Sequence, residues 1–281
     1  MVVWGEQRAH PGQAGWGLAV RNLLFPQFCR QCGARLLTEE NGYFCPDCWE
    51  SSPRIERPFC TCCGRPHEGM VGLGSRANFP CADCRDRPPR HVDRIFGAAV
   101  YDGAVGNAVR LLKFRGKQRL ARPIGEVMAG FARSEMEPDA YDLVTPVPLH
   151  RVRARARGFN QSALLAAEVL PCFPNARLME DLWRIRPTRT QSKLHGETER
   201  RANVQGAFAA VGEGFRGKRV LLVDDVVTTS VTVSECAAAL RRAGAVRVDV
   251  FAASLAVVSP QRALLARVLA GGTNALLDFR Q

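Results

Sequence analysis

The sequence predicts an α/β protein with a mostly parallel sheet and helices on both faces, preceded by a small cysteine-rich region that reads as a double zinc ribbon. Two observations indicate this division. Nine of the 11 cysteines lie between Cys29 and Cys84, and from Ile95 onward short apolar runs alternate with segments of helical periodicity. Such alternation is typical of strands joined by crossover helices, which bury both faces of a parallel sheet.

The cysteines of the N-terminal region form four C-x-x-C pairs, a spacing typical of zinc ribbons. Each pair makes a tight turn that points two thiolates at one tetrahedral ion. Pairing along the chain predicts two structural Zn²⁺ sites, one held by Cys29, Cys32, Cys45 and Cys48 and the other by Cys60, Cys63, Cys81 and Cys84. Interleaved pairing and a redox or disulfide cluster are the alternatives, and Cys62 is an alternative ligand to Cys63.

Charge is distributed unevenly along the chain. The formal net charge is +12, yet residues 1–94 hold 12 basic and 10 acidic residues, while residues 95–281 hold 27 basic and 17 acidic residues. The positive field therefore belongs to the second part. We expect the ribbons to act as a scaffold or a protein contact, with metal supplying their folding energy because they have few aliphatic residues.

The elements of the second part follow from periodicity and from stop signals. Strands are short apolar runs, and helices repeat apolar residues every three or four positions. Gly244 ends the last helix as a C′ residue, and Pro88-Pro89 marks a connection. The expected strands are Ile95–Tyr101, Asp142–Val147, Gly206–Val211, Arg219–Val223 and Val246–Phe251. The expected helices are Val105–Phe114, Leu120–Arg133, Gln161–Leu170 and Thr232–Ala243.

These patterns divide the chain into four parts. We expect an N-terminal arm or helix over residues 1–28, the double zinc ribbon over 29–90, the α/β domain over 91–260, and a C-terminal helix or tail over 261–281.

No apolar run approaches the roughly 20 residues of a membrane helix. Met1–Gln13 lacks the apolar core of a secretory signal. We therefore expect a cytoplasmic protein without membrane insertion, where structural disulfides are rare.

The most informative segment follows the strand Arg219–Val223. Two adjacent acids, Asp224 and Asp225, precede a loop and a helix start formed by Thr228, Thr229, Ser230, Val231 and Thr232. Unpaired N–H groups and the positive end of the helix dipole favour an anion there. The carboxylates would repel phosphate, so they suit ribose hydroxyls or a sugar–Mg²⁺ unit. The segment predicts a receptor for a sugar 5-phosphate; the alternative is a strand end with an ordinary helix cap.

Two basic segments add to this picture. Arg151, Arg153, Arg155 and Arg157 follow a strand end and are candidates to receive pyrophosphate, although not all four can point inward. The run from Arg110 to Arg122 holds six basic residues and no acid. It fits capture of an anionic substrate near the site better than contact with single-stranded nucleic acid, which remains the alternative.

The run from Asp224 to Thr232 resembles the 5-phosphoribosyl-1-pyrophosphate (PRPP) signature of type I phosphoribosyltransferases, with Ser230 where Gly is usual. Together with the ribbons, the R-x-R-G-F-N-Q run ending at Gln161 and the E-R-x-x-N-V-x-G-A-F run ending at Phe208, it looks like the ComF family. The resemblance covers Leu23 to Val258 and implies a type I phosphoribosyltransferase-like fold, PRPP with Mg²⁺ as the ligand, and a link to DNA uptake. In this resemblance Arg189 belongs to a mobile loop that closes over PRPP and keeps water out.

Two functions follow as hypotheses. In the first, the protein transfers a phosphoribosyl group from PRPP to an unidentified nucleophile and releases pyrophosphate, with Asp224 and Asp225 anchoring the ribose. In the second, it is a non-catalytic PRPP- or nucleotide-sensing accessory protein that handles single-stranded DNA or contacts competence-machinery proteins.

Overall fold

A five-stranded parallel sheet forms the centre of the protein. The computed structural model describes residues 26–36, 42–67, 77–187 and 197–257. Strand order is β3-β9-β8-β4-β5, and every neighbouring pair is parallel. The strands are β3 (Arg94–Val100), β4 (Leu143–Pro146), β5 (Arg177–Leu178), β8 (Arg219–Val227) and β9 (Arg247–Leu255). The expected N-terminal arm or helix over residues 1–28 and the expected C-terminal helix or tail over residues 261–281 lie almost wholly outside the described residues.

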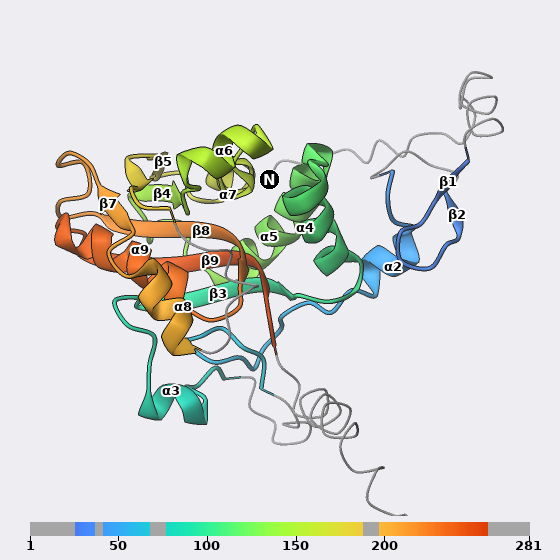
Figure 1. The fold of residues 1–281 in the computed structure, drawn as a ribbon. Helices are drawn as coiled ribbons and strands as arrows, with labels where there is room; N and C mark the ends of the chain where they lie inside the picture. Colours follow the sequence, from blue (N-terminus) through green and yellow to red (C-terminus); the bar gives the residue numbers. More distant parts are fainter. Residues whose placement is uncertain (1–25, 37–41, 68–76, 188–196, 258–281) are drawn as a thin grey trace, which may run out of the picture.

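Helices cover both faces of this sheet, as the sequence predicts (Figure 1). On one face α5 (Ala121–Glu135) and α7 (Gln161–Val169) pack together, with α4 (Gly103–Arg115) beside α5. On the other face lies α9 (Val231–Arg242), against which α8 (Glu197–Val204) packs. Short 3₁₀ turns at Gln118–Leu120 and Leu170–Cys172 extend two of these helices. The predicted fold class is confirmed, because alternating strands and crossover helices bury a continuous apolar core.

Local sequence explains where the main helices begin and end. The Asp102 side chain accepts a hydrogen bond from the Gly103 N–H at 2.9 Å and caps α4. Helix α4 ends at Gly116, whose φ of 64° is left-handed, and Gly244 at φ 90° follows α9 as predicted. The last turn of α4 thereby stops beside the carboxyl end of β8, where Lys113 meets an acid of that strand.

Three of the differences from the sequence prediction bear on the main sheet and the site. Strand β8 continues through the two acids to Val227, because its neighbour β9 pairs with it as far as Leu255. The predicted strand over Gly206–Val211 is shorter, and β7 (Phe208–Ala210) lies outside the main sheet in an antiparallel hairpin with β6 (Leu182–Arg184). The arginine-rich segment forms a helix, α6 (Arg151–Arg157).

The cysteine-rich region holds two four-cysteine clusters, paired along the chain. Its regular elements are β1 (Gln27–Phe28), β2 (Arg35–Leu36), α2 (Pro46–Glu50) and α3 (Ala82–Asp86). One cluster is Cys29, Cys32, Cys45 and Cys48, the other is Cys60, Cys63, Cys81 and Cys84, and within each the sulfurs lie within 4.8 Å of one another. The Sγ atoms of Cys32 and Cys45 are 3.7 Å apart and those of Cys63 and Cys81 are 3.9 Å apart. Thiolates about 2.3 Å from a tetrahedral Zn²⁺ lie about 3.8 Å from one another, so both clusters fit zinc.

Backbone N–H groups converge on one sulfur in each cluster. The Cys60 Sγ accepts hydrogen bonds from the N–H groups of Cys62, Cys63 and Cys81 at 3.2–3.4 Å. The Cys63 side chain and these N–H groups lower the pKa of Cys60 to about 3, which favours the thiolate that zinc requires.

The second ribbon is docked against the edge of the sheet. The Ile95 N–H donates to the Cys62 carbonyl oxygen at 2.9 Å, and the Phe59 and Phe131 rings are 5.8 Å apart. A Cβ at Gly64 would lie 2.4 Å from the Ile95 carbonyl oxygen, so this close approach requires glycine. The ribbon therefore covers part of β3, an edge strand that would otherwise expose unpaired backbone groups.

None of the helices in the described part of the chain combines the length and apolar character needed to span a bilayer.

Cys62 provides a matched test of the metal sites. We expect wild type to carry two zinc ions per chain, Cys60→Ser to lose one, and Cys62→Ser to keep both, because Cys62 belongs to neither cluster. Zinc content of the purified proteins, measured by elemental analysis, checks this. Equal zinc loss in both variants would contradict the pairing.

Candidate functional site

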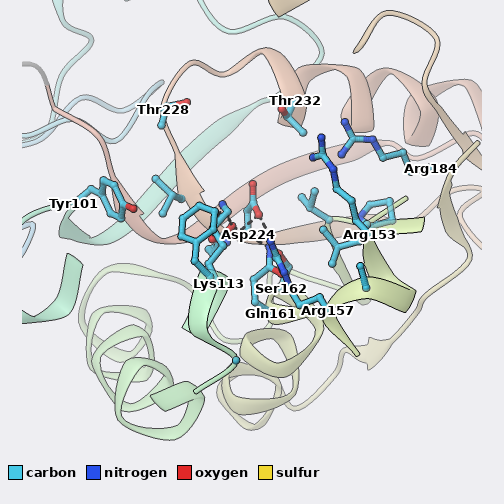
Figure 2. Close-up of a pocket in the computed structure, with 18 residues that line it drawn as sticks. Tyr101, Lys113, Arg153, Arg157, Gln161, Ser162, Arg184, Asp224, Thr228 and Thr232 are labelled. Carbon is cyan, nitrogen blue, oxygen red and sulfur yellow. Dashed lines mark hydrogen bonds and ion pairs between the residues drawn. The ribbon is translucent and has the colours of Figure 1, made fainter. Parts of the chain in front are cut away.

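A cavity of about 900 Å³ opens at the carboxyl ends of β4 and β8. Its walls come from the end of α4, from α6, from the start of α7, from β6 and from the loop that leads into α9. Figure 2 shows Asp224 near the middle of the cavity, with Arg153 and Arg184 to one side and Tyr101 to the other. This is where ligands are expected to bind in parallel α/β sheets.

Two adjacent buried carboxylates form the floor of the cavity. Asp224 is 7% exposed and Asp225 is 2% exposed. The Ser162 hydroxyl donates to Asp224 Oδ1 at 3.0 Å, and the Asp225 N–H donates to the same oxygen at 2.9 Å. These bonds fix the orientation of the Asp224 carboxylate at the carboxyl end of β8.

Lys113 is the counter-ion of Asp225. Its Nζ lies 2.7 Å from Asp225 Oδ2 and 3.0 Å from Oδ1. Gln161 Nε2 donates to Oδ1 at 3.4 Å, and Arg157 in turn donates to the Gln161 side-chain oxygen. A chain of side chains from three helices thus converges on one buried carboxylate.

The two acids are held in different protonation ranges. Burial, strengthened by the neighbouring Asp225 charge, raises the pKa of Asp224 to about 7. Burial opposes ionisation of Asp225 too, but the Lys113 ammonium overrides it and lowers the pKa of Asp225 below its ordinary value. The Lys113 pKa is raised, because the attraction of Asp225 outweighs the effect of burial. Asp225 is therefore the more readily ionised of the two acids, and Asp224 is the more readily protonated.

Two residues of the hydroxyl-rich loop lie at the rim of the cavity. Thr228 and Thr232 line the cavity, and Ser230 is the N-cap residue of α9 without a side-chain cap hydrogen bond. The first N–H groups of a helix have no partner within it, so they are available to an anion. Ser230 has φ −64°, an ordinary conformation, so the serine at this position introduces no backbone strain. The Thr229 Oγ1 atom is buried and has no hydrogen-bond partner within the described residues.

The helical form of the arginine-rich segment divides its four arginines. Arg153 and Arg157 are one helical turn apart and both line the cavity. Arg155 is exposed, and the exposed Arg151 lies over the Trp183 ring at 5.5 Å, so neither lines the cavity. Arg189 lies outside the described residues.

Several lining residues were missed by sequence reasoning. Arg184, on β6, brings a third guanidinium to the wall formed by Arg153 (Figure 2). Ser162 and Gln161 begin α7 directly after the R-x-R-G-F-N run, so their place in that motif was the available signal. Lys113 was recognised only as one of six basic residues. No local pattern pairs it with Asp225, which is 112 positions away.

The fold and the site together define a class of protein in which a parallel α/β domain, with an acidic pair and an arginine wall in one cavity, is attached to two zinc-ribbon-type cysteine clusters. A family model described as a double zinc ribbon domain matches residues 20–86. The DNA utilization protein YhgH of Escherichia coli O157:H7 is 31% identical over 82% of this chain and 97% of its own length. The chain therefore belongs to the family of YhgH and competence protein F, the ComF family that its motifs resemble.

More distant relatives carry related names. Competence protein F of Haemophilus influenzae is 27% identical over 79% of this chain and 94% of its own length. Among solved structures, a glutamine PRPP amidotransferase from B. subtilis, complexed with ADP and GMP, is 21% identical over 48% of this chain and 27% of that chain, with a TM-score of 0.34. The solved structure of an allosteric regulatory enzyme of purine biosynthesis is 23% identical over 48% of this chain and 26% of that chain, with a TM-score of 0.32.

Replacing each acid with asparagine should change the free energy of unfolding in opposite directions, because the two pKa values are shifted in opposite directions. The folded-state pKa of Asp224 lies above the ordinary 3.8, so its contribution to stability falls as pH rises from about 3.8 to about 7. We expect Asp224→Asn to raise the free energy of unfolding by on the order of 1–3 kcal/mol above this window and by less at its acid end. Asp225→Asn should destabilise at neutral pH, because it leaves Lys113 without its partner. Denaturant unfolding across this pH range checks both, and two variants that shift stability alike would contradict the assignment.

Proposed function

We propose that the cavity binds PRPP or a related phosphoribosyl ligand and that the protein transfers the phosphoribosyl group to a nucleophile, releasing pyrophosphate. The observation that supports this is the meeting of three features in one cavity: the buried acids, the open start of α9, and the guanidinium wall. Each suits a different part of PRPP: the acids suit the ribose hydroxyls, the start of α9 suits the 5-phosphate, and the arginines suit the pyrophosphate.

The binding mode follows from charge. The 5-phosphate would lie against the loop from Thr228 to Thr232, at the start of α9, where the first N–H groups of the helix have no partner within the helix. The ribose hydroxyls would donate to Asp224 and Asp225. The pyrophosphate would meet Arg153, Arg157 and Arg184, whose forked donors match phosphate oxygens.

The reaction breaks the bond between ribose C1 and the pyrophosphate oxygen. The electron pair of that bond leaves with pyrophosphate, and a lone pair of the nucleophile forms the new bond to C1 before the nucleophile loses its proton. Positive charge would develop on the ribose ring, and the Asp225 carboxylate would lie near it. Arginine contacts would stabilise the leaving pyrophosphate, so positioning and electrostatics would supply most of the rate.

The remaining parts of the proposal come from sequence. The ribbon would occupy residues 29–90 and the phosphoribosyl-binding domain residues 91–260, with Arg189 in a loop over the ligand. Mg²⁺ would arrive on the pyrophosphate oxygens as part of the ligand. We place the protein in the cytoplasm, where reduced cysteines remain available to zinc.

A second function is favoured by the names of the relatives. They are called DNA utilization and competence proteins, so this chain could act in the use of incoming single-stranded DNA. The cavity would then be a sensor for PRPP or a nucleotide, and the ribbons and the basic run from Arg110 to Arg122 would contact competence proteins. Pyrophosphate release from PRPP, measured over a panel of bases and amines, separates the two: turnover supports transfer, and binding without turnover supports sensing.

Two arginines on α6 provide a matched test of ligand binding. We expect Arg153→Met to weaken PRPP binding about tenfold or more, since hydrogen bonds to charged groups contribute about 1.5–3 kcal/mol. Arg155→Met should change it by less than about twofold, because Arg155 is exposed and lies outside the cavity lining. Titration calorimetry with PRPP checks both variants. Equal losses of affinity in the two variants would show that PRPP binding depends only on the net charge of α6, and would overturn the proposed binding mode.

A further inference from the structure

The acids at the centre of the cavity already hold a cation. Lys113 Nζ contacts both oxygens of Asp225, at 2.7 and 3.0 Å. The side chain of Lys113 is 28% exposed and that of Asp225 is 2% exposed. Taking Asp225 out of water without a partner would be costly, so the ammonium is what allows this carboxylate to remain ionised beneath the cavity.

A divalent metal ion does not fit the same carboxylate in this arrangement. Mg²⁺ binds carboxylate oxygens at about 2.0–2.1 Å and demands near-octahedral geometry. Both Asp225 oxygens face the Lys113 ammonium, and Oδ1 is also within 3.4 Å of Gln161 Nε2. On Asp224, Oδ1 receives two hydrogen bonds, from Ser162 and from the Asp225 N–H. A metal ion on Asp225 would have to displace the ammonium or lie beside it as a like charge.

The position of Lys113 is fixed by the helix that carries it. It lies in the last turn of α4, which ends at the left-handed Gly116, and the neighbouring Phe114 ring lies 6.0 Å from its Nζ. An ammonium carries three N–H donors, and the two Asp225 oxygens engage it from one side. Lys113 also lines the cavity, so a remaining donor is available to a ligand oxygen.

We propose that Lys113 is the resident cation of the acidic pair, so that this site binds the hydroxyls of a 5-phosphorylated pentose without a divalent metal ion on Asp225. The inference rests on the proposed function, because it takes the acids as the ribose subsite. Lys113 acts through Asp225 as a positioning residue, holding the carboxylate charged and oriented to accept from ribose hydroxyls. Any Mg²⁺ requirement would then belong to the pyrophosphate part of PRPP.

Ribose 5-phosphate is the probe that isolates this subsite, because it has the phosphate and the hydroxyls but no pyrophosphate. Binding is measured by titration calorimetry in magnesium-free buffer and again with Mg²⁺ added. No chelator is used, since it would remove zinc from the ribbons. We expect the dissociation constant of wild type to change by less than about twofold when Mg²⁺ is added, which is within the range of a weak exposed charge effect.

Three variants test the role of the ammonium. Lys113→Met keeps much of the side-chain volume without charge and should lose about tenfold or more in affinity in magnesium-free buffer, regaining it when Mg²⁺ is added. Lys113→Arg retains the charge and should keep metal-free binding. The matched control is Lys117→Met, an exposed residue of the same basic run that does not line the cavity, and it should behave as wild type.

The outcomes separate this inference from the proposed function. Wild type that binds ribose 5-phosphate only with Mg²⁺ would overturn the role of Lys113 and leave the proposed function intact. Lys113→Met binding as wild type without Mg²⁺ would do the same. Wild type that binds neither ribose 5-phosphate nor PRPP, with or without Mg²⁺, would overturn both. If Lys113→Met does not fold, the wild-type comparison and Lys113→Arg still decide the question.

Discussion

Burial of two adjacent carboxylates at the end of β8 is the constraint on which the site depends. Two such charges in a low-dielectric floor repel each other, and the protein resolves this with one ammonium and a network of donors. Lys113 keeps Asp225 charged, while Ser162 and a backbone N–H orient Asp224. The result is an acceptor surface facing an otherwise cationic cavity. Such a surface discriminates between the hydroxyls and the phosphates of a single ligand, because phosphate is repelled where hydroxyl is attracted.

The rest of the fold serves to bring these groups together. The parallel sheet places the ends of β4 and β8 side by side. Residues of α4, α6 and α7 line the cavity at these strand ends. The ribbons lie away from the cavity lining and pack against the outer part of the domain, where Cys62 and Phe59 contact β3 and α5. The four-cysteine clusters therefore lie in a region packed on the sheet edge, while the candidate site lies in the α/β domain.

Features contained in one short run of sequence could be predicted, whereas contacts between segments far apart in the sequence could not. The zinc ligands, the acids and the start of α9 are each contained in a short run, so spacing and composition were sufficient. The pairing of Lys113 with Asp225 depends on how α4 packs against β8, and Arg184 reaches the cavity only because β6 folds over it. The arginine-rich run was recognised, but its helical form decides that Arg153 and Arg157 turn inward and Arg155 outward.

A crystal structure with ribose 5-phosphate tests the central claim most directly. We expect the phosphate on the N–H groups between Thr228 and Thr232, the hydroxyls on Asp224 and Asp225, and Lys113 still beside Asp225. A phosphate bound instead to Arg153 and Arg184, with the sugar turned away from the acids, would contradict it.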